Sequence, residues 1–470
     1  MTTTYEVFDP ATLEPVGSAP LHDEADVDLA VQRAVAAGPA WAADREARRA
    51  ALRGAAAALR AKAPGIGRTL SLEQGKVLRE AVGEVLVAAD VFDYYADLEW
   101  DEQESLPERG GRSLTVQRRP VGVVAAITPW NFPISLLSVK LAPALAAGCT
   151  VIAKPSPTTP LSTIALVEAV VGFVPDGVVQ WLTGRRAVNR ALSEHPRVRK
   201  ISFTGSTEVG AAIAAQAAPT VKRVTLELGG NDPAIVLPDA DAAFTAAGIV
   251  GSAFRNAGQV CMAVKRVFVP AEREAELVEA ITAEAAKLVV GHGVADGTTM
   301  GPMHSRSQLE LVQGLVREAL DGGARLAGGG GRGASLPGHF LEPTVVAGAG
   351  FDSALVAQEQ FGAALPVVAY TDLDDLLDRL NAQEFGLGAS LWTPDLGRAE
   401  DLAGRIEAGT VWINQHTQVE LDAPFGGWKA SGVGRERGPV GLEPYLELRT
   451  VNARAHAPAP SPAPAASPAR

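Results

Sequence analysis

The spacing of apolar residues along the chain changes near residue 120. Between about Asp23 and Asp101, apolar residues recur at helical spacing in stretches rich in alanine, arginine, glutamate and leucine, such as EADVDLAVQRAVAAGPAW and REARRAALRGAAAALRAK. Pro64 and Gly65 interrupt this pattern once, and we expect the helical region to break there. The region before residue 120 is therefore predicted to be mainly helical.

Beyond this point the apolar residues come in short runs rich in β-branched side chains. The first series is VGVVAAI, CTVIAK, VVQWLTG and RKISFTG, and the second is TLELGGNDPAIVL, VKRVFVP, LEPTVVAG and ALPVVAY. Helix-compatible segments such as EREAELVEAITAEAAKLV separate these runs. Buried strands that alternate with helices are typical of parallel sheets, so the fold class is predicted to be α/β.

Three further segments stand outside this alternation. SLTVQRRP follows Gly110 and Gly111 and is predicted to form a strand. AGGGGRGASLPG, residues 327–338, is predicted to be a flexible connection, because no strand-to-helix switch follows it and a phosphate-binding loop needs one. The tail at 455–470 consists mostly of alanine, proline and serine and is predicted to be disordered.

Composition excludes several classes of function. The chain has 470 residues, 47% of them hydrophobic, which is enough for two domains of common size. The net charge of −12 argues against general nucleic-acid binding, which needs a basic surface. The longest apolar region, from Val121 to Ala153, is interrupted by prolines and by Lys140, so we expect no membrane span and no membrane partner.

The two cysteines, Cys149 and Cys261, are too few for a disulfide framework or a zinc site, and no metal is expected. The first residues, MTTTYEVFDP, lack the basic and apolar regions of a signal peptide. We therefore expect a protein of the reducing cytoplasm.

Cys261 is the first candidate for chemistry. It lies in FRNAGQVCMAVKRVFV, just before a predicted strand, and Asn256, Gly258 and Gln259 make the preceding segment a poor core run. This cysteine is either a buried structural residue or a nucleophile, because a thiolate attacks carbonyl groups and is a good leaving group. Cys149 in LAAGCTVIAK enters an apolar strand and is predicted to belong to the core.

Glu227 and Asn131 are polar residues in otherwise apolar surroundings. Glu227 ends the run TLE and precedes two glycines. Near an apolar site its pKa would rise toward that of a general base, and an ion pair with Lys222 or Arg223 is the alternative. Asn131 lies in TPWNFP, between two aromatic residues. It either makes turn hydrogen bonds or donates to an oxyanion.

The segment FTGSTEVG, from Phe203 to Gly210, has the pattern of a strand, a Gly205–Ser206 turn and a helix. Backbone N–H groups at the start of a helix favour an anionic phosphate. The glycine pattern of the usual dinucleotide fingerprint is absent, so this segment by itself does not predict a standard Rossmann site.

Together these segments resemble the aldehyde dehydrogenase superfamily. The motifs PWNFP, AKPSPTTP, FTGSTEVG, LELGGNDP, FRNAGQVC, EQFG and PFGGWKASGVGRERG occur in the order found in that family, over about residues 5–452. The resemblance implies a Rossmann-like cofactor domain at 1–108 and 121–227, an α/β catalytic domain at 228–415, and a small β extension at 109–120 and 440–454. Because this extension commonly joins subunits, a homodimer or homotetramer is expected.

The resemblance also implies an enzyme that oxidises an aldehyde to an acid with NAD or NADP. Cys261 would add to the aldehyde to give a thiohemiacetal, and the Asn131 amide and the Cys261 backbone N–H would hold its oxyanion. Glu227 would activate the water that hydrolyses the resulting thioester. Its presence favours a free acid, because the branch that acylates coenzyme A tends to lack it. Glu436 in SGVGRERG matches a residue proposed as a second proton relay, with a surface or interface charge as the alternative.

The cofactor-binding residues that the resemblance implies are Trp130, Lys154, Gly205, Ser206, Glu359 and Phe361. Lys154 would bind the adenosine ribose, and Glu359 in QEQFG would hold the nicotinamide ribose with Phe361 beside it. The Gly205–Ser206 turn would face the pyrophosphate.

The sequence departs from the family's pattern at positions that bear on specificity. Pro157 replaces a glutamate that binds the adenosine ribose in many NAD-preferring relatives, so we expect NAD from the family's usage, with NADP as the alternative. Val139 replaces a tunnel tryptophan, and Val260 and Met262 flank the nucleophile. We expect that no arginine or histidine in these segments binds a second carboxylate of the substrate. His416 in NQHTQ is expected near the tunnel mouth. A medium-sized apolar or aromatic aldehyde is the predicted substrate.

Two alternatives stand beside this function. One is a catalytically idle member of the family that acts as a binding or structural protein, which the presence of Cys261, Asn131 and Glu227 disfavours. The other is acyl transfer to an acceptor other than water, which Glu227 disfavours.

Overall fold

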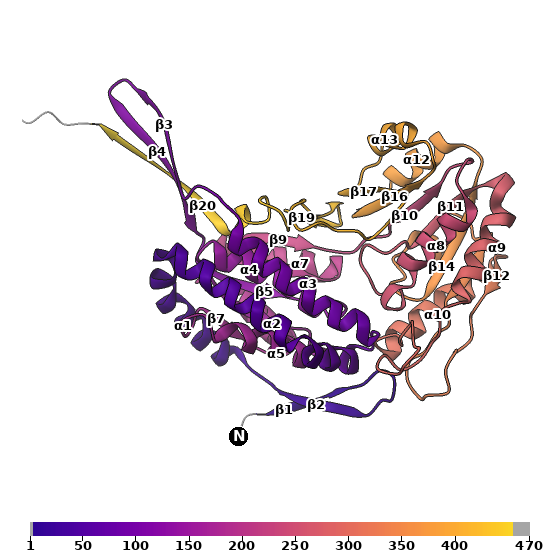
Figure 1. Cartoon of the computed structure of the whole chain (residues 1–470), viewed down its shortest axis with the longest axis horizontal. Coiled ribbons are helices and arrows are strands. Elements are labelled where there is room, and N and C mark those ends of the chain that lie inside the picture. Colours follow the sequence, from indigo (N-terminus) through magenta and orange to yellow (C-terminus); the bar gives the residue numbers. More distant parts are fainter. Residues whose placement is uncertain (1–2, 455–470) are drawn as a thin grey trace, which may run out of the picture.

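The protein consists of two sheets that are each covered by helices, and of a β extension that projects from the first of them (Figure 1). The computed structural model describes residues 3–454, so the tail predicted to be disordered at 455–470 lies outside the described residues. The predicted α/β class is confirmed, because parallel strands alternate with helices in both halves. No helix among the described residues is long and apolar enough to cross a membrane.

A hairpin and three helices precede the first sheet. The hairpin strands β1 (Thr4–Phe8) and β2 (Pro15–Pro20) pair antiparallel. The helices are α1 (Glu24–Ala43), α2 (Arg45–Gln74) and α3 (Leu78–Asp97). Asp23 starts α1 by accepting hydrogen bonds from the next turn, and Gly75 ends α2 at a φ of +104°, a conformation that favours glycine.

The predicted break at Pro64 and Gly65 is wrong. α2 continues through both residues. The buried stripe that includes Leu59, Ile66 and Leu70 runs past the proline on both sides. Burial of this stripe outweighs the roughly 3 kcal/mol that a proline costs inside a helix.

The first sheet has six strands in the order β19-β9-β8-β5-β6-β7. Its strands are β5 (Val123–Ile127), β6 (Thr150–Lys154), β7 (Val179–Trp181), β8 (Val198–Thr204), β9 (Arg223–Glu227) and β19 (Gly432–Val433). β5 to β9 are parallel, and β19 joins β9 antiparallel from near the end of the chain. Every residue of β5 and β6 is buried, as expected for strands covered on both faces.

Helices cover both faces of this sheet. α2 and α3 pack on one face with α4 (Pro133–Ala146) and α5 (Pro160–Val171). α1 packs on the other face with α6 (Arg186–Glu194) and α7 (Thr207–Ala217), which the short 3-10 helix η1 (Ala218–Thr220) follows.

The second sheet has seven strands in the order β12-β13-β14-β11-β10-β16-β17. Its strands are β10 (Pro233–Val236), β11 (Arg266–Pro270), β12 (Arg325–Gly328), β13 (Thr344–Ala347), β14 (Ala364–Tyr370), β16 (Gly388–Trp392) and β17 (Thr410–Ile413). Only β12, at one edge, is antiparallel to its neighbour.

Helices of the second half are α8 (Ala242–Ala253), α9 (Glu274–Ala285), α10 (Arg306–Asp321), α11 (Ala354–Ala357), α12 (Leu373–Asn381) and α13 (Leu396–Ala403), with the 3-10 helices η2 (Arg255–Gly258) and η3 (Ala271–Arg273). They pack with the sheet around one apolar core. A small ribbon of β15 (Phe385–Gly386) and β18 (Trp428–Lys429) lies beside this half.

The extension is a three-stranded antiparallel sheet in the order β20-β4-β3. β4 (Arg112–Pro120) contains the predicted strand, and β20 (Leu446–Arg454) follows the 3-10 helix η4 (Glu443–Tyr445). β3 (Gln103–Arg109) also belongs to this sheet, which therefore begins ahead of the predicted residue 109. Gly110 and Gly111, at φ values of +60° and +71°, make the turn between β3 and β4.

Candidate active site

A cavity of about 490 Å³ lies where the two halves meet. Asn131, Thr204 and Glu227 line it from the carboxyl ends of the first sheet, and Cys261 and Thr417 line it from the second half. Its apolar lining is formed by Val87, Phe132, Leu136, Val139, Leu228, Val260, Met262, Val419, Leu421 and Phe425. A cleft at the carboxyl ends of parallel strands is where α/β proteins usually bind ligands.

Cys261 lies in a loop with an unusual backbone. Three successive residues of η2, Asn256, Ala257 and Gly258, have φ values of +49°, +54° and +75°. A Cβ on Gly258 would lie 2.2 Å from a backbone oxygen of Gly362, so only glycine fits there. The loop presents Cys261 to the cavity, where its side chain is partly exposed.

The thiol of Cys261 is in an environment that disfavours its charge. Desolvation, together with the nearby carboxylates of Glu359, Asp232 and Glu227, raises the pKa of the thiol to about 12, and Lys265 opposes them. The thiol is therefore protonated at neutral pH in this state, and a base or a rearrangement of charge must accompany its ionisation.

Asn131 points its amide toward the loop that carries Cys261. Its Nδ2 donates to the Gln259 backbone oxygen at 3.0 Å, two residues before the cysteine. Its own backbone oxygen accepts from Lys76 Nζ at 2.7 Å and from Asn256 Nδ2 at 3.2 Å. These bonds hold a side-chain amide donor beside the thiol.

A buried ion pair that sequence reasoning missed positions this segment. Lys76 pairs with Glu84, and both side chains are almost fully buried. The other oxygen of Glu84 accepts from the backbone N–H groups of Ile134 and Ser135 at 3.0 Å each, at the start of α4. Lys76 also lies 3.6 Å from the centre of the Phe132 ring. The sequence shows these two charges only as members of a helical region.

Glu227 ends β9 and is 4% exposed. Among the described residues neither carboxylate oxygen has a hydrogen-bond partner. Burial raises its pKa well above the ordinary value, and Glu436 adds to the rise. The alternative ion pair with Lys222 or Arg223 is wrong: Arg223 pairs with Glu447, and Lys222 donates to the backbone oxygen of His195.

Glu436 is also buried, with 4% of its surface exposed, so the alternative of a surface charge is wrong. It forms an ion pair with Lys140, whose ammonium also donates to Thr204 Oγ1 at 2.7 Å. Ser202 Oγ lies 3.4 Å from Glu436 Oε1, and the Tyr445 hydroxyl donates to Ser202 Oγ at 3.2 Å. Lys140, which the sequence showed only as a charge interrupting an apolar region, thus belongs to the site.

The predicted phosphate-binding turn lies between β8 and α7. Ser206 is the N-cap of α7, and its hydroxyl accepts from the Val209 N–H at 3.4 Å. A Cβ on Gly205 would lie 2.4 Å from the Phe203 ring. Because the first N–H groups of a helix have no partners within it, this turn fits a pyrophosphate.

Lys154 is buried at the end of β6, which β5 separates from β8 and from this turn. Burial lowers the pKa of its ammonium to about 8. It forms no ion pair with any residue that the structure describes, which leaves a donor for a ribose hydroxyl. Pro157 lies in the turn that follows, and no carboxylate replaces the missing glutamate at that position.

Trp130 and Phe361 belong to an aromatic cluster with His304, a residue that sequence reasoning missed. The His304 ring stacks on Trp130 with 4.4 Å between ring centres, and Phe361 meets Trp130 edge-on at 5.6 Å. Burial lowers the pKa of His304 to about 4, so its ring is neutral. Nearby, Glu359 accepts from the Gly230 N–H at 3.3 Å, and burial raises its pKa to about 7.

The expectations about the substrate end of the cavity need two corrections. Arg255, in the FRNAGQVC motif, and Arg79, at the start of α3, both line the cavity, so the expected lack of arginine is wrong. His416 is not at the mouth: it is buried, with Nε2 3.5 Å from Asp232 Oδ2. Arg255 is part of a linear motif, but the sequence does not show that it faces the cavity or that His416 is buried, because both depend on tertiary packing.

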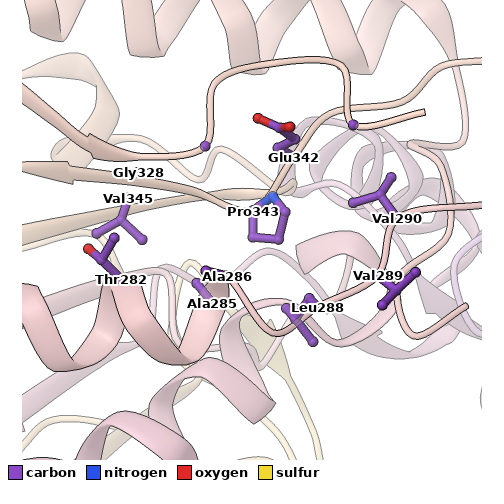
Figure 2. Close-up of a pocket in the computed structure, with 12 residues that line it drawn as sticks. Thr282, Ala285, Ala286, Leu288, Val289, Val290, Gly328, Glu342, Pro343 and Val345 are labelled. Atoms are coloured by element: carbon purple, nitrogen blue, oxygen red, sulfur yellow. The ribbon is translucent and has the colours of Figure 1, made fainter. Parts of the chain in front are cut away.

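A second cavity, of about 470 Å³, lies in the second half and contains none of the predicted site residues. Figure 2 shows this cavity between the end of α9, the strand β13, and the glycine-rich loop that follows β12. Glu342 is its one charged lining residue, and its carboxylate accepts from the Gly331 N–H at 2.9 Å. This cavity offers no nucleophile.

A sequence model of the aldehyde dehydrogenase family matches residues 1–451. The chain is 39% identical to geranial dehydrogenase of Castellaniella defragrans, over 95% of this chain and 94% of that protein. It is 38% identical to succinate-semialdehyde dehydrogenase (NADP(+)) of Escherichia coli, over 94% and 93%. A crystal structure of aldehyde dehydrogenase from Brucella melitensis biovar abortus superposes with a TM-score of 0.93 at 38% identity, covering 97% of this chain and 95% of that one.

Proposed function

The chain belongs to the aldehyde dehydrogenase family and is an NAD(P)-dependent aldehyde dehydrogenase, and we propose that it oxidises a medium-sized apolar or aromatic aldehyde to the free carboxylic acid. One observation carries this proposal. Cys261, Asn131 and Glu227 line the same cavity, and the Glu227 carboxylate is buried there without a hydrogen-bond partner among the described residues. A nucleophile, an amide donor and an unoccupied base are the groups that this reaction requires.

In the proposed first step the Cys261 sulfur attacks the aldehyde carbon. A C–S bond forms, and the carbonyl electron pair moves to oxygen. The Asn131 amide exchanges its bond to Gln259 for one to this oxyanion, and the Cys261 backbone N–H is the second donor. Removing one such donor costs about 2.7–4 kcal/mol in other enzymes. Lys154, Glu359 and Phe361 would hold the cofactor, which would supply the acceptor for the hydride that the carbon loses as it becomes a thioester on Cys261.

Glu227 serves the second step. Its carboxylate takes a proton from water, the water oxygen attacks the thioester, and the C–S bond breaks to release the acid and the thiolate. The raised pKa of Glu227 suits a base that works near neutral pH. Glu436, held by Lys140, would pass the proton onward. The same glutamate can take the thiol proton of Cys261 before attack.

The cavity lining supports the proposed substrate class. Phe132, Leu136 and Phe425 are among ten apolar side chains that would contact the aldehyde's substituent. Val139 leaves room where a tryptophan would fill the tunnel. The relative from Castellaniella defragrans is named for geranial, an apolar aldehyde, whereas the Escherichia coli relative is named for a semialdehyde. Arg79, Arg255 and Arg437 are the arginines in the lining that a semialdehyde's carboxylate would use, so that class is the alternative to test.

The cofactor, the assembly and the location are also part of the proposal. Residues 1–108 and 121–227, apart from β3 of the extension, would bind the cofactor, and 228–415 would carry the nucleophile. NAD is the proposed cofactor from the family's usage, with NADP second, because Pro157 neither repels nor attracts a 2′-phosphate. The extension, whose β20 exposes 70% of Leu448, would join two or four subunits. Both cysteines are free thiols, which supports the reducing cytoplasm.

The test is aldehyde-dependent reduction of NAD and NADP, followed with aliphatic, aromatic and semialdehyde substrates. Wild-type protein is expected to reduce cofactor with the apolar or aromatic aldehydes, and Cys261→Ala to lose this activity while it still binds cofactor. Cys149→Ala is the matched control and keeps the activity.

Preference for semialdehydes would overturn the substrate class. Activity in Cys261→Ala would overturn the mechanism, and cofactor binding with no turnover would favour the idle-member alternative. Product analysis separates the free acid from an acyl group passed to another acceptor.

A further inference from the structure

Lys265 is a buried lysine between the two loops that carry the nucleophile and the cofactor residues. Its side chain is almost fully buried, and its ammonium donates to the Gly258 backbone oxygen at 2.8 Å. The same ammonium lies 4.6 Å from the centre of the Phe361 ring. It forms no ion pair with a described residue, although burying an ammonium is costly without one. Its position therefore calls for a role beyond packing.

The bond to Gly258 supports the strained backbone before Cys261. Gly258 is the last of the three residues with positive φ, and two of these, Asn256 and Ala257, are not glycine. A left-handed conformation costs a non-glycine residue roughly 1–2 kcal/mol. A buried donor on the third carbonyl of this run favours the conformation that presents Cys261 to the cavity.

Burial lowers the pKa of Lys265, and the charges around it, which are nearly all negative, oppose this by favouring its ammonium form. Glu359 and Asp232 face both the ammonium and the Cys261 thiol, and Glu227 faces the thiol as well. Lys265 supplies the positive charge that opposes these carboxylates at Cys261, and it also favours the charged form of Glu359. One ammonium thus acts on the nucleophile and on the carboxylate predicted to hold the nicotinamide ribose.

We propose that Lys265 is a positioning residue for this site: it fixes the Cys261 loop through Gly258 and supplies the positive charge that lets a thiolate form beside three carboxylates. This rests on the proposed role of Cys261 as the nucleophile. Lys265 touches neither the aldehyde nor its reacting atoms in the proposed mechanism, so it acts through Cys261 and Glu359.

The experiment measures the rate at which iodoacetamide alkylates Cys261 as a function of pH, with the labelled cysteine identified by mass spectrometry. In Lys265→Met the midpoint of this profile is expected to move up by about 1 pH unit or more, because a neutral side chain no longer stabilises the thiolate. In Lys265→Arg, which keeps the positive charge, the midpoint is expected to stay close to its wild-type value. Lys287→Met, at a lysine whose side chain is 69% exposed, is the matched control and leaves the midpoint unchanged.

A second variant covers the case in which Lys265→Met does not fold. Glu359→Gln removes a negative charge that faces Cys261 and is expected to lower the alkylation midpoint while it raises the KM for the cofactor. An unchanged midpoint in folded Lys265→Met, or in Glu359→Gln, would overturn the proposal, as would reduced turnover with an unaltered alkylation profile. Alkylation reports on the thiol whether or not an aldehyde is oxidised. A failure of the proposed reaction would instead appear as activity that survives in Cys261→Ala.

Discussion

The two sheets share a parallel architecture but differ in what they bury. In the first sheet, Lys200, Ser202 and Thr204 point from alternate positions of β8 to the same face, and Thr225 and Glu227 continue this polar row on β9. In the second sheet, β11 and β14 bury mainly valine, leucine, alanine and phenylalanine, and Arg266 at the start of β11 is a buried charge.

The difference shows which of the two sheets carries a row of buried polar side chains at a cost in stability. A buried ammonium or carboxylate loses its hydration, and only good partners offset that loss. Lys140 and Glu436 pair with each other, Lys200 Nζ donates to Thr225 Oγ1 at 2.6 Å, and Glu227 has no hydrogen-bond partner among the described residues. β11 and β14 of the second sheet supply mainly packing, and Arg266 donates to the backbone oxygens of Asn231 and Val356. The second half contributes to the site through loops such as the one that carries Cys261, which comes before β11.

The largest expected effect is at Glu227. Glu227→Gln removes the proposed base and keeps the side chain's shape, so steady turnover is expected to fall by about 10²–10⁴-fold. The first turnover does not need hydrolysis, and rapid-mixing measurements should still show a burst of reduced cofactor. Equal loss of the burst and of turnover would mean that Glu227 is needed before hydride transfer.

The next effect is on stability. Lys140→Met leaves the buried Glu436 carboxylate without its cation, and we expect the free energy of unfolding to fall by about 3–5 kcal/mol in denaturant titrations. Adding Glu436→Gln should recover much of this loss. Lys222→Met, at a less buried lysine, should change stability by no more than about 0.5 kcal/mol. If the two lysine variants lost stability equally, the buried pair would not be the cause.

The smallest effect is on the pH dependence of stability. Burial lowers the pKa of Lys200 from 10.5 to about 7, so between these values the unfolded chain binds more protons than the folded one. The free energy of unfolding therefore rises with pH, by up to about 1.4 kcal/mol per pH unit from this group. In Lys200→Met this contribution is lost, and denaturant titrations from about pH 7 to 9 should show a shallower rise.

Ile235→Val in β10 is the matched control from the apolar sheet. Ile235 is fully buried, and its truncation should cost about 0.5–1.5 kcal/mol at every pH, with the wild-type slope retained. If the Lys200 variant kept that slope too, the polar row would not titrate as described.

Most strands of both sheets could be predicted from the sequence, because each is a short apolar run between turns. The runs VVAAI, TVIAK and ALPVVAY form β5, β6 and β14 as expected. β12, β16, β17 and β19 were not predicted. RLAG and GV carry no such pattern, and β12 and β19 depend on pairing with other strands. The break expected at Pro64 was wrong because local propensity yields to the packing of a long helix.

The residues of the candidate site also divide into those that a local motif indicates and those that depend on distant contacts. Cys261, Asn131 and Glu227 stand out within short motifs, and the structure brings all three to one cavity, where their roles stay predictions. Lys140 is charged in the sequence, as are Lys76 and Glu84, but nothing local indicates which lysine is buried or which carboxylate it meets. These partners lie on different elements, and only tertiary packing brings them together.

β19 and Glu436 lie near the end of the chain, so the site can be completed only late in protein synthesis. Gly432 pairs with Glu227, and Glu436 meets Lys140 from 296 residues further along the chain. A ribosome must release nearly the whole polypeptide before these contacts can form, although both sheets have most of their strands much earlier. A prematurely terminated product could therefore assemble much of each sheet around an unneutralised Lys140, and only a completed chain becomes an enzyme.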